Sequence, residues 1–158
     1  MELVRYDDEV LTNGCQHFDF ANPPFDPVEF AQNLTKFMYE NNGVGLAANQ
    51  VGIPYRIFAM RGHPENFVCY NPKIIVYGND QVVLEEGCLT FPRLLVKIKR
   101  SNYIKVRFQT PNSETITKEF IGLSSRIFQH EFDHLDGIVF YKKANKFHRD
   151  QAMKRWKQ

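Results

Sequence analysis

Apolar positions follow a helical period near the N-terminus, a strand period in the middle of the chain, and a helical period again after residue 123. In the first region, apolar side chains repeat at the spacing of one helix face, at Phe30, Ala31, Leu34, Phe37 and Met38. Asp26 suits the N-cap and Pro27 the first helical position, whereas Gly43 follows the last turn. The pattern predicts a helix over residues 27–41.

Between residues 55 and 121, apolar and polar residues alternate as they do in strands with one buried face. The predicted strands cover residues 56–60, 73–77, 81–84, 95–99, 103–108 and 115–120. We expect turns at Gly78-Asn79-Asp80 and at Thr110-Pro111-Asn112-Ser113, where glycine, proline and short polar side chains gather.

The C-terminal third is predicted to be mostly helical. A helix that starts near Ser124 or Ser125, either of which can cap it, should end at Asp136-Gly137. Residues 138–141 predict a short strand. The tail from residue 145 is basic and amphipathic, and we expect a docked helix with its apolar positions at Phe147, Met153 and Trp156.

Composition limits the class of protein. The 158 residues are enough to bury a core, and we expect a single domain over residues 1–158. A net charge of +2 is too small to indicate nucleic acid as the main partner, and no apolar run approaches the roughly 20 residues of a membrane span. The three cysteines are an odd, widely spaced set, unlike a secreted disulfide framework. We therefore expect a soluble cytoplasmic protein with reduced thiols.

The segment from Gln129 to Gly137 carries the clearest chemical signal. His130 and His134 are four residues apart, so on a helix their imidazoles project from one face and can share a divalent cation. Glu131 lies beside such a cation and can move a proton to or from the reacting groups. This H-E-x-x-H pattern indicates a catalytic metal helix, and the apolar neighbours of the histidines indicate that it is buried.

Two imidazoles leave a third ligand to be found. Cys88 is the candidate, because a thiolate is a common partner of two imidazoles, whereas Cys15 and Cys69 are expected to be buried structural thiols. Spacing alone does not choose among the three cysteines. The glycine-rich segment Gly43–Gly52 has Gln50 as its one large polar donor, and taken alone it favours a tight helix-to-strand loop over a binding segment.

Three segments taken together resemble the motifs of the peptide deformylase family, in the same order. They are Gly43-Val44-Gly45-Leu46-Ala47-Ala48-Asn49-Gln50, Glu86-Gly87-Cys88-Leu89-Thr90 and Gln129-His130-Glu131-Phe132-Asp133-His134-Leu135-Asp136-Gly137. The resemblance implies an α+β fold in which antiparallel sheets surround the metal-binding helix. It also implies that the peptide substrate adds along a strand edge beside the first motif.

The resemblance implies a hydrolase that releases formate from the N-terminal formylmethionine of nascent polypeptides. Cys88, His130 and His134 would hold the metal, with Fe²⁺ as the physiological ion and Ni²⁺, Co²⁺ or Zn²⁺ as substitutes. A metal-bound hydroxide would attack the formyl carbon, with Glu131 as general acid/base. Gln50 and the backbone N–H of Leu89 would stabilise the oxyanion.

The same resemblance implies a set of substrate-binding residues, at Val44, Gly45, Glu86, Gly87, Leu123, Arg126 and Ile127. The partners would be N-formylmethionyl peptides and nascent chains near the ribosome exit, without direct contact to nucleic acid or membrane, and the protein would be a monomer. The C-terminus ends soon after Trp156, as in short bacteriophage-encoded members. A viral protein of this kind would work in the cytoplasm of the host cell.

Two other functions share parts of this pattern. A metallopeptidase can be built on the same H-E-x-x-H helix, although the Gly87-Cys88-Leu89 segment favours the deformylase. A homologue that binds metal without activity is the second alternative. It is disfavoured because neither Glu131 nor Gln50 is needed merely to hold a metal.

Overall fold

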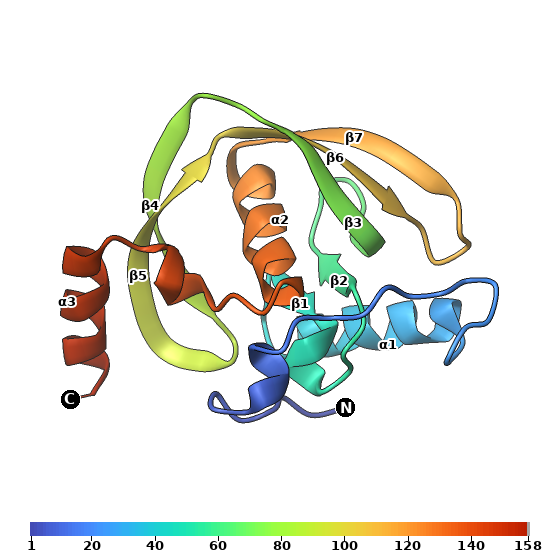
Figure 1. The fold of residues 1–158 in the computed structure, drawn as a ribbon, viewed down its shortest axis with the longest axis horizontal. Coiled ribbons are helices and arrows are strands. Elements are labelled where there is room, and N and C mark those ends of the chain that lie inside the picture. The colour runs from blue at the N-terminus through green and yellow to red at the C-terminus, as the bar shows by residue number, and fades with distance from the viewer. Residues whose placement is uncertain (158) are drawn as a thin grey trace.

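The computed structural model of the chain describes residues 1–157 as helices and strands arranged around one central helix, α2 (Figure 1). The helical elements are η1 (Glu9–Leu11), α1 (Pro27–Glu40), η2 (Ala48–Val51), α2 (Gly122–Leu135), η3 (Phe140–Lys143) and α3 (Lys146–Trp156), where η marks a 3-10 helix. The strands are β1 (Gly45–Ala47), β2 (Ile57–Met60), β3 (Phe67–Tyr77), β4 (Gln81–Cys88), β5 (Phe91–Ser101), β6 (Tyr103–Gln109) and β7 (Thr115–Ile121).

The strands form two antiparallel sheets, with α2 between them (Figure 1). Five strands pair in the order β1-β2-β3-β6-β7, and β4 pairs with β5 as a separate hairpin. The central helix contacts β1, β2, β6 and β7 on one side and β5 on the other. The predicted α+β fold with antiparallel sheets around the metal-motif helix is confirmed.

Helix α1 forms where the apolar period predicted it. The Asp26 carboxylate accepts hydrogen bonds from the backbone N–H groups of Val28 and Glu29, which otherwise lack partners at a helix start. Its apolar face is buried through Ala31, Leu34 and Met38. Burial of a side chain such as Leu34 contributes about 1.5–3 kcal/mol. This helix closes the core that lies under β1 and β2.

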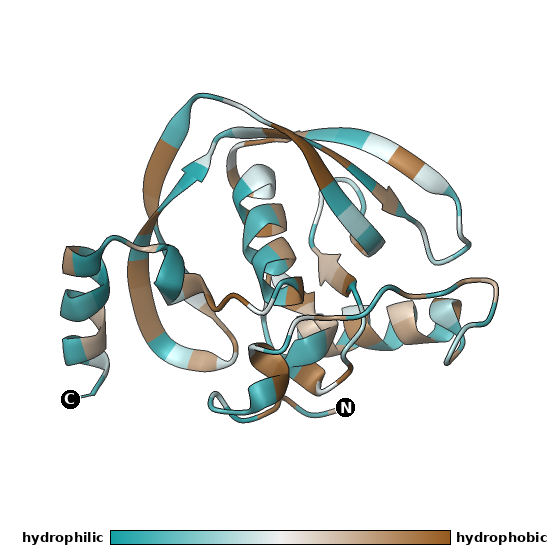
Figure 2. Cartoon of the chain, viewed as in Figure 1, coloured by the Kyte–Doolittle hydropathy of each residue, from teal (hydrophilic) through white to brown (hydrophobic). Residues whose placement is uncertain are grey.

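Helix α2 is buried along most of its length, although many of its side chains are hydrophilic (Figure 2). The prediction that Ser124 or Ser125 caps it is wrong: the helix begins at Gly122, after Ile121 in the N-cap position. The Ser125 hydroxyl instead donates to the carbonyl of Ser101, 2.9 Å away, because it lies inside the fold against β5. The helix ends as predicted, with Gly137 in a left-handed conformation at φ +75°.

The chain after α2 departs from the predictions at two places. Residues 138–141 do not form a strand. The 3-10 helix η3 begins at Phe140, whose side chain fills the core beneath β5. Helix α3 forms, and the indole N–H of Trp156 donates to the Pro92 carbonyl at 2.9 Å. The prediction that Phe147 packs against the rest of the protein is wrong, since this residue is 70% exposed. Ala152 is the buried residue of this helix.

The six predicted strands between residues 55 and 121 lie where the structure has strands, and all but the first, 56–60, are too short. Strand β3 begins at Phe67, six residues before the predicted start, and β5 reaches from Phe91 to Ser101. The glycine-rich segment is not simply a loop, because it contains β1 and the η2 turn. Among the helices of residues 1–157, none has the length and hydrophobicity needed to cross a bilayer.

Candidate metal centre and cleft

Three potential metal ligands meet between the β4–β5 hairpin and α2. Cys88 ends β4, and its Sγ lies 3.4 Å from Nε2 of His134. The ligand atoms of Cys88, His130 and His134 all lie within 4.8 Å of one another. The structure therefore chooses Cys88 among the three cysteines. Cys69 is fully buried in β3, where burial raises the pKa of its thiol, and burial likewise raises the pKa of Cys15 to about 11.

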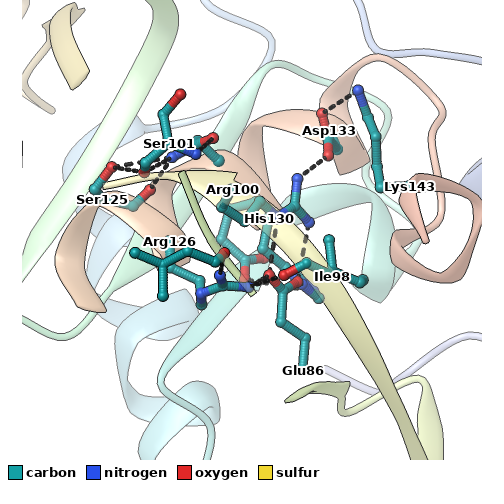
Figure 3. A network of polar contacts seen from close by, with 12 residues as sticks. Glu86, Ile98, Arg100, Ser101, Ser125, Arg126, His130, Asp133 and Lys143 are labelled. Atoms are coloured by element: carbon teal, nitrogen blue, oxygen red, sulfur yellow. Dashed lines mark hydrogen bonds and ion pairs between the residues drawn. The ribbon is translucent and has the colours of Figure 1, made fainter. Parts of the chain in front are cut away.

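The ring of His130 is supported by a buried cluster of charged side chains (Figure 3). Its Nδ1 lies 3.0 Å from Oε1 of Glu86. Arg100 holds the Glu86 carboxylate with two hydrogen bonds of 2.8 and 2.9 Å, and Arg126 donates to the same carboxylate. Arg100 also reaches Asp133 at 2.6 Å. We call Glu86, Arg100, Arg126 and Asp133 the ionic cluster.

The ionic cluster keeps Glu86 ionised in the interior. Burial alone would raise the pKa of Glu86, but hydrogen bonds from Arg100 and His130 lower it to about 2. Burial opposes a charge on His130 too, yet Glu131, Cys88 and Glu86 together raise the pKa of that imidazole well above its ordinary value. The negative groups that hold a proton on His130 would equally favour a metal cation, which His130 would bind after releasing that proton.

The surroundings of His134 are different in kind. Its side chain is fully buried, and burial together with the nearby charge of His130 lowers its pKa well below the ordinary value. The ring is therefore neutral, which is the state in which imidazole binds metal. Nδ2 of Asn49 donates to the backbone carbonyl of His134 at 2.7 Å. Within residues 1–157, Nδ1 of His134 and Oδ1 of Asn49 have no hydrogen-bond partner.

Glu131 lies beside the ligands without a close partner of its own. Its carboxylate is buried, with Oε2 3.9 Å from Nε2 of His130, and Oε1 has no hydrogen-bond partner in the described part of the chain. Burial raises the pKa of Glu131 to about 7, against the opposing charge of His130. A carboxyl group with such a pKa can accept and release a proton near neutral pH. Gly45 permits this position, since a Cβ there would lie 2.5 Å from Oε2.

The orientation of the Gln50 amide follows from its partners. The backbone N–H of Ala47 can only donate, and it bonds Oε1 of Gln50 at 2.9 Å. Nε2 must then point the other way, where it donates to the Thr90 hydroxyl at 3.0 Å and lies 3.4 Å from Sγ of Cys88. The side chain thus presents a fixed N–H donor at the metal site. Leu89 directly follows Cys88, in the turn that joins β4 to β5.

A cleft of about 440 Å³ opens over these residues. Every residue predicted to bind substrate lines it, namely Val44, Gly45, Glu86, Gly87, Leu123, Arg126 and Ile127. Two of them have their charges already bonded. Glu86 accepts from Arg100 and Arg126, and Arg126 donates to Glu86 and to the carbonyls of Val82 and Ile98. The structure adds lining residues outside the three motifs, at Asn42, Glu85, Pro92 and Arg93.

Arg100 is the most important residue that sequence reasoning missed. It is 5% exposed and joins Glu86 to Asp133. The alternation of β5 contained a signal for it, because Leu94, Val96 and Ile98 mark the inward face and Arg100 is the next position on that face. A charged residue in the buried register of a strand requires a buried partner. The partner itself could not be named from the sequence.

The donor set fits a divalent transition metal. One thiol and two imidazoles are the ligand types that bind Zn²⁺, Fe²⁺, Co²⁺ and Ni²⁺, and three protein ligands leave a position for water or substrate. The histidine supports match this role, since Glu86 takes the ring nitrogen of His130 that a metal on the opposite nitrogen would leave free. The residues present therefore fit a catalytic metal site.

Comparison with known proteins places this site in a family. The sequence model described as polypeptide deformylase matches residues 1–150. The chain is 37% identical over 167 aligned positions to a peptide deformylase of Wolbachia pipientis (strain wPip), with 97% of this chain and 91% of that protein covered. It is 44% identical over 108 residues to a peptide deformylase of Thermotoga maritima, a match that spans 68% of this chain and 66% of the relative.

A solved structure shows the same arrangement of elements. The crystal structure of peptide deformylase from Thermus thermophilus superposes with a TM-score of 0.91 at 31% sequence identity. The superposition covers 97% of this chain and 90% of that one. The likeness therefore includes both sheets and the metal-motif helix between them.

Proposed function

Because the chain belongs to the polypeptide deformylase family, we propose that it is a metal-dependent hydrolase that removes the formyl group from N-formylmethionyl peptides and releases formate. The observation that carries the proposal is the cluster of Cys88, His130 and His134 beside a cleft that Cys88 and His130 line together with Glu131 and Gln50. A site that only stored metal would need neither the buried carboxyl of Glu131 nor the oriented amide of Gln50.

Cys88, His130 and His134 would hold the metal, which when bound activates water for attack on the formyl carbon. Glu131 is the general acid/base: it takes a proton as water attacks and gives it to the departing amine nitrogen. Its pKa of about 7 and its position beside Nε2 of His130 support this role. Atoms balance, since water supplies the hydroxyl of formate and the proton of the amine.

Charge that develops on the formyl oxygen needs donors at fixed positions. Gln50 supplies Nε2–H, held in place by the bonds of its amide to Ala47 and Thr90. The backbone N–H of Leu89, directly after Cys88, is the second donor that we propose. The Gln50 amide is already oriented by these bonds, so it needs little rearrangement as the charge forms.

The cleft walls would bind the peptide. Val44 directly precedes the edge strand β1 and Gly45 begins it, and an extended peptide can add along this strand. Leu123 and Ile127 offer apolar contacts to a methionine side chain. Arg126 contributes through its aliphatic part, since its guanidinium is bonded to Glu86 and to two carbonyls. Glu86 lines the same wall, with its carboxylate bonded to Arg100, Arg126 and His130.

The proposed function is tested by comparing substrates. Purified, metal-loaded protein should release formate from formyl-Met-Ala-Ser and should not cleave the unmodified peptide Met-Ala-Ser or its acetylated form. Cleavage of a peptide bond in the unmodified peptide would indicate the metallopeptidase instead. Protein with full metal and no reaction on any of the three would indicate the inactive homologue.

We propose Fe²⁺ as the physiological ion on the basis of the family resemblance. Ni²⁺, Co²⁺ or Zn²⁺ would be substitutes, because the thiolate and imidazole donors accept all four. Protein reconstituted anaerobically with Fe²⁺ should lose activity in air, since Fe²⁺ and the Cys88 thiolate are both oxidised there. Ni²⁺-loaded protein should persist, and Zn²⁺-loaded protein should be stable but slower. Equal kcat/KM for iron and zinc, with no loss in air, would overturn the iron proposal.

Further proposals concern the whole protein. We propose one catalytic domain over residues 1–158, supported by the family match over residues 1–150. We propose that it acts as a cytoplasmic monomer on nascent chains near the ribosome exit, without direct contact to nucleic acid or membrane. The resemblance to short, bacteriophage-type members stays a prediction, because the relatives named above do not include such a protein.

A further inference from the structure

The two histidines of the metal site differ in the support that their rings receive. A histidine that binds metal through one ring nitrogen almost always donates its other N–H to an acceptor, which fixes the tautomer and the ring orientation. His130 has such a partner in Glu86, 3.0 Å from its Nδ1. His134 faces Cys88 with Nε2, so its Nδ1 should carry the proton, and within residues 1–157 this nitrogen has no partner.

Asn49 is the side chain already bonded to His134. It is fully buried in the η2 turn, directly before Gln50, and its Nδ2 donates to the His134 carbonyl at 2.7 Å. This carbonyl belongs to the last turn of α2, where the helix itself leaves carbonyl groups without partners. The amide oxygen of Asn49 is a buried acceptor without a partner in the described chain.

Only three buried side-chain atoms of residues 1–157 lack a hydrogen-bond partner, on Asn49, Glu131 and His134. Two of them are complementary, since Oδ1 of Asn49 can only accept and Nδ1–H of His134 can only donate. They lie on a pair of residues already joined by one hydrogen bond. Buried polar atoms rarely stay without partners, so an acceptor and a donor left over on joined residues indicate a common function.

We propose that Asn49 is the positioning residue of His134. Its N–H group holds the carbonyl of His134. Its amide oxygen and Nδ1 of His134 do not bond each other in this structure; their hydrogen bond belongs to the metal-loaded protein, where it would keep Nε2 of the neutral ring directed at the metal. The same residue ties the η2 turn, and hence Gln50, to the end of α2. In the metal-loaded protein Asn49 would thus do with a neutral amide for His134 what Glu86 does with a carboxylate for His130.

The test compares Asn49→Leu with Asn41→Leu as a matched control. Nδ2 of Asn41 donates to the Phe37 carbonyl at 2.9 Å, which is the same kind of bond at the end of α1, away from the metal site. Co²⁺-loaded protein is mixed with excess chelator, and loss of the Co²⁺ absorption gives the rate of metal release. Asn49→Leu should release metal at least about 10-fold faster than the wild type, whereas Asn41→Leu should match it.

A second readout is specific to the ring. In Zn²⁺-loaded protein labelled with ¹⁵N-histidine, the Nδ1–H signal of His134 should exchange with water faster in Asn49→Leu, while the His130 signals stay as they were. If Asn49→Leu does not fold, Asn49→Ala removes both the N–H donor and the acceptor without adding volume, and it should also release metal faster. Wild-type release rates overturn the proposal. Equal loosening of both histidines overturns it too, because that result indicates a purely structural role.

Discussion

The rings of His130 and His134 lie 5.1 Å apart on one helix face, but the regions that support them have little in common. His130 lies against the ionic cluster, in which Arg100 and Arg126 enclose the Glu86 carboxylate (Figure 3). His134 is held through its carbonyl by the neutral amide of Asn49. The first region comes from β4, β5 and α2, and the second comes from the η2 turn.

The difference shows how the site keeps its charges in balance. Glu86 already raises the pKa of Glu131, and a second carboxylate beside His134 would raise it further. Glu131 would then stay protonated at neutral pH and could not accept a proton. A neutral support at His134 avoids this, and it leaves that imidazole uncharged and ready to bind metal. A charged carboxylate supports His130, and a neutral amide supports His134.

Glu131→Gln should have the largest effect on turnover, because it removes the proton carrier while both histidine supports stay intact. The amide keeps the shape of the side chain but cannot move a proton, so kcat should fall by about 10²–10⁴-fold. Metal content, measured by elemental analysis, should match the wild type. A variant with full metal and near-normal kcat would show that Glu131 is not the general base.

Gln50→Ala tests the neutral side of the site at a residue next to Asn49. Loss of one oriented donor should lower kcat by roughly 10²–10³-fold, with a smaller change in KM, since the amide acts mainly on the developing oxyanion. Steady-state kinetics on a formylated peptide measure both constants. A change confined to KM would make Gln50 a residue that binds substrate in its ground state.

Glu86→Gln removes the negative charge that Arg100 and Arg126 share in the ionic cluster. It leaves Arg100 and Arg126 buried without their carboxylate, so the free energy of unfolding should drop by about 3–5 kcal/mol. Metal affinity should fall by about 10–100-fold as His130 loses its partner. Glu85→Gln is the control on the same strand, where an exposed carboxylate pairs across from Lys97, and it should change stability by less than about 1 kcal/mol. Equal effects of the two variants would contradict the role of the ionic cluster.

Acid should weaken the ionic cluster over a defined range of pH. The folded protein lowers the pKa of Glu86 from 4.5 to about 2, so this carboxylate stabilises the fold above pH 4.5. That stabilisation should be lost progressively as the pH falls from 4.5 toward 2. Urea unfolding of the wild type and of Glu86→Gln across this range should show the two stabilities converging. Parallel curves would assign the acid sensitivity to other groups.

Lys143→Gln should have the smallest effect. Its ammonium lies 3.8 Å from the Asp133 carboxylate, at the outer end of the ionic cluster, and its side chain is 44% exposed. A solvated pair of this kind contributes about 0–1 kcal/mol, and less at high salt. Thermal unfolding should change little, and metal affinity should not change. A loss comparable to that of Glu86→Gln would mean that the ionic cluster depends on its exposed edge.

The sequence by itself determined the elements whose causes are local. The cap at Asp26 and the apolar period after it specify α1, because both act within a few residues. The four-residue spacing of His130 and His134 brings their rings together on any helix, whatever surrounds it. The three motifs in order were enough to indicate the family, and the match over residues 1–150 confirms it.

The tertiary structure decided what depends on contacts between distant segments. It selected Cys88 as the third ligand, it brought Arg100 to Glu86, and it placed Asn49 on the carbonyl of a residue 85 positions away. It also moved the start of α2 to Gly122, because Ser125 bonds Ser101 inside the fold and does not cap the helix. A buried polar group must find a partner, but which partner it finds depends on how the elements pack, and no local pattern records that.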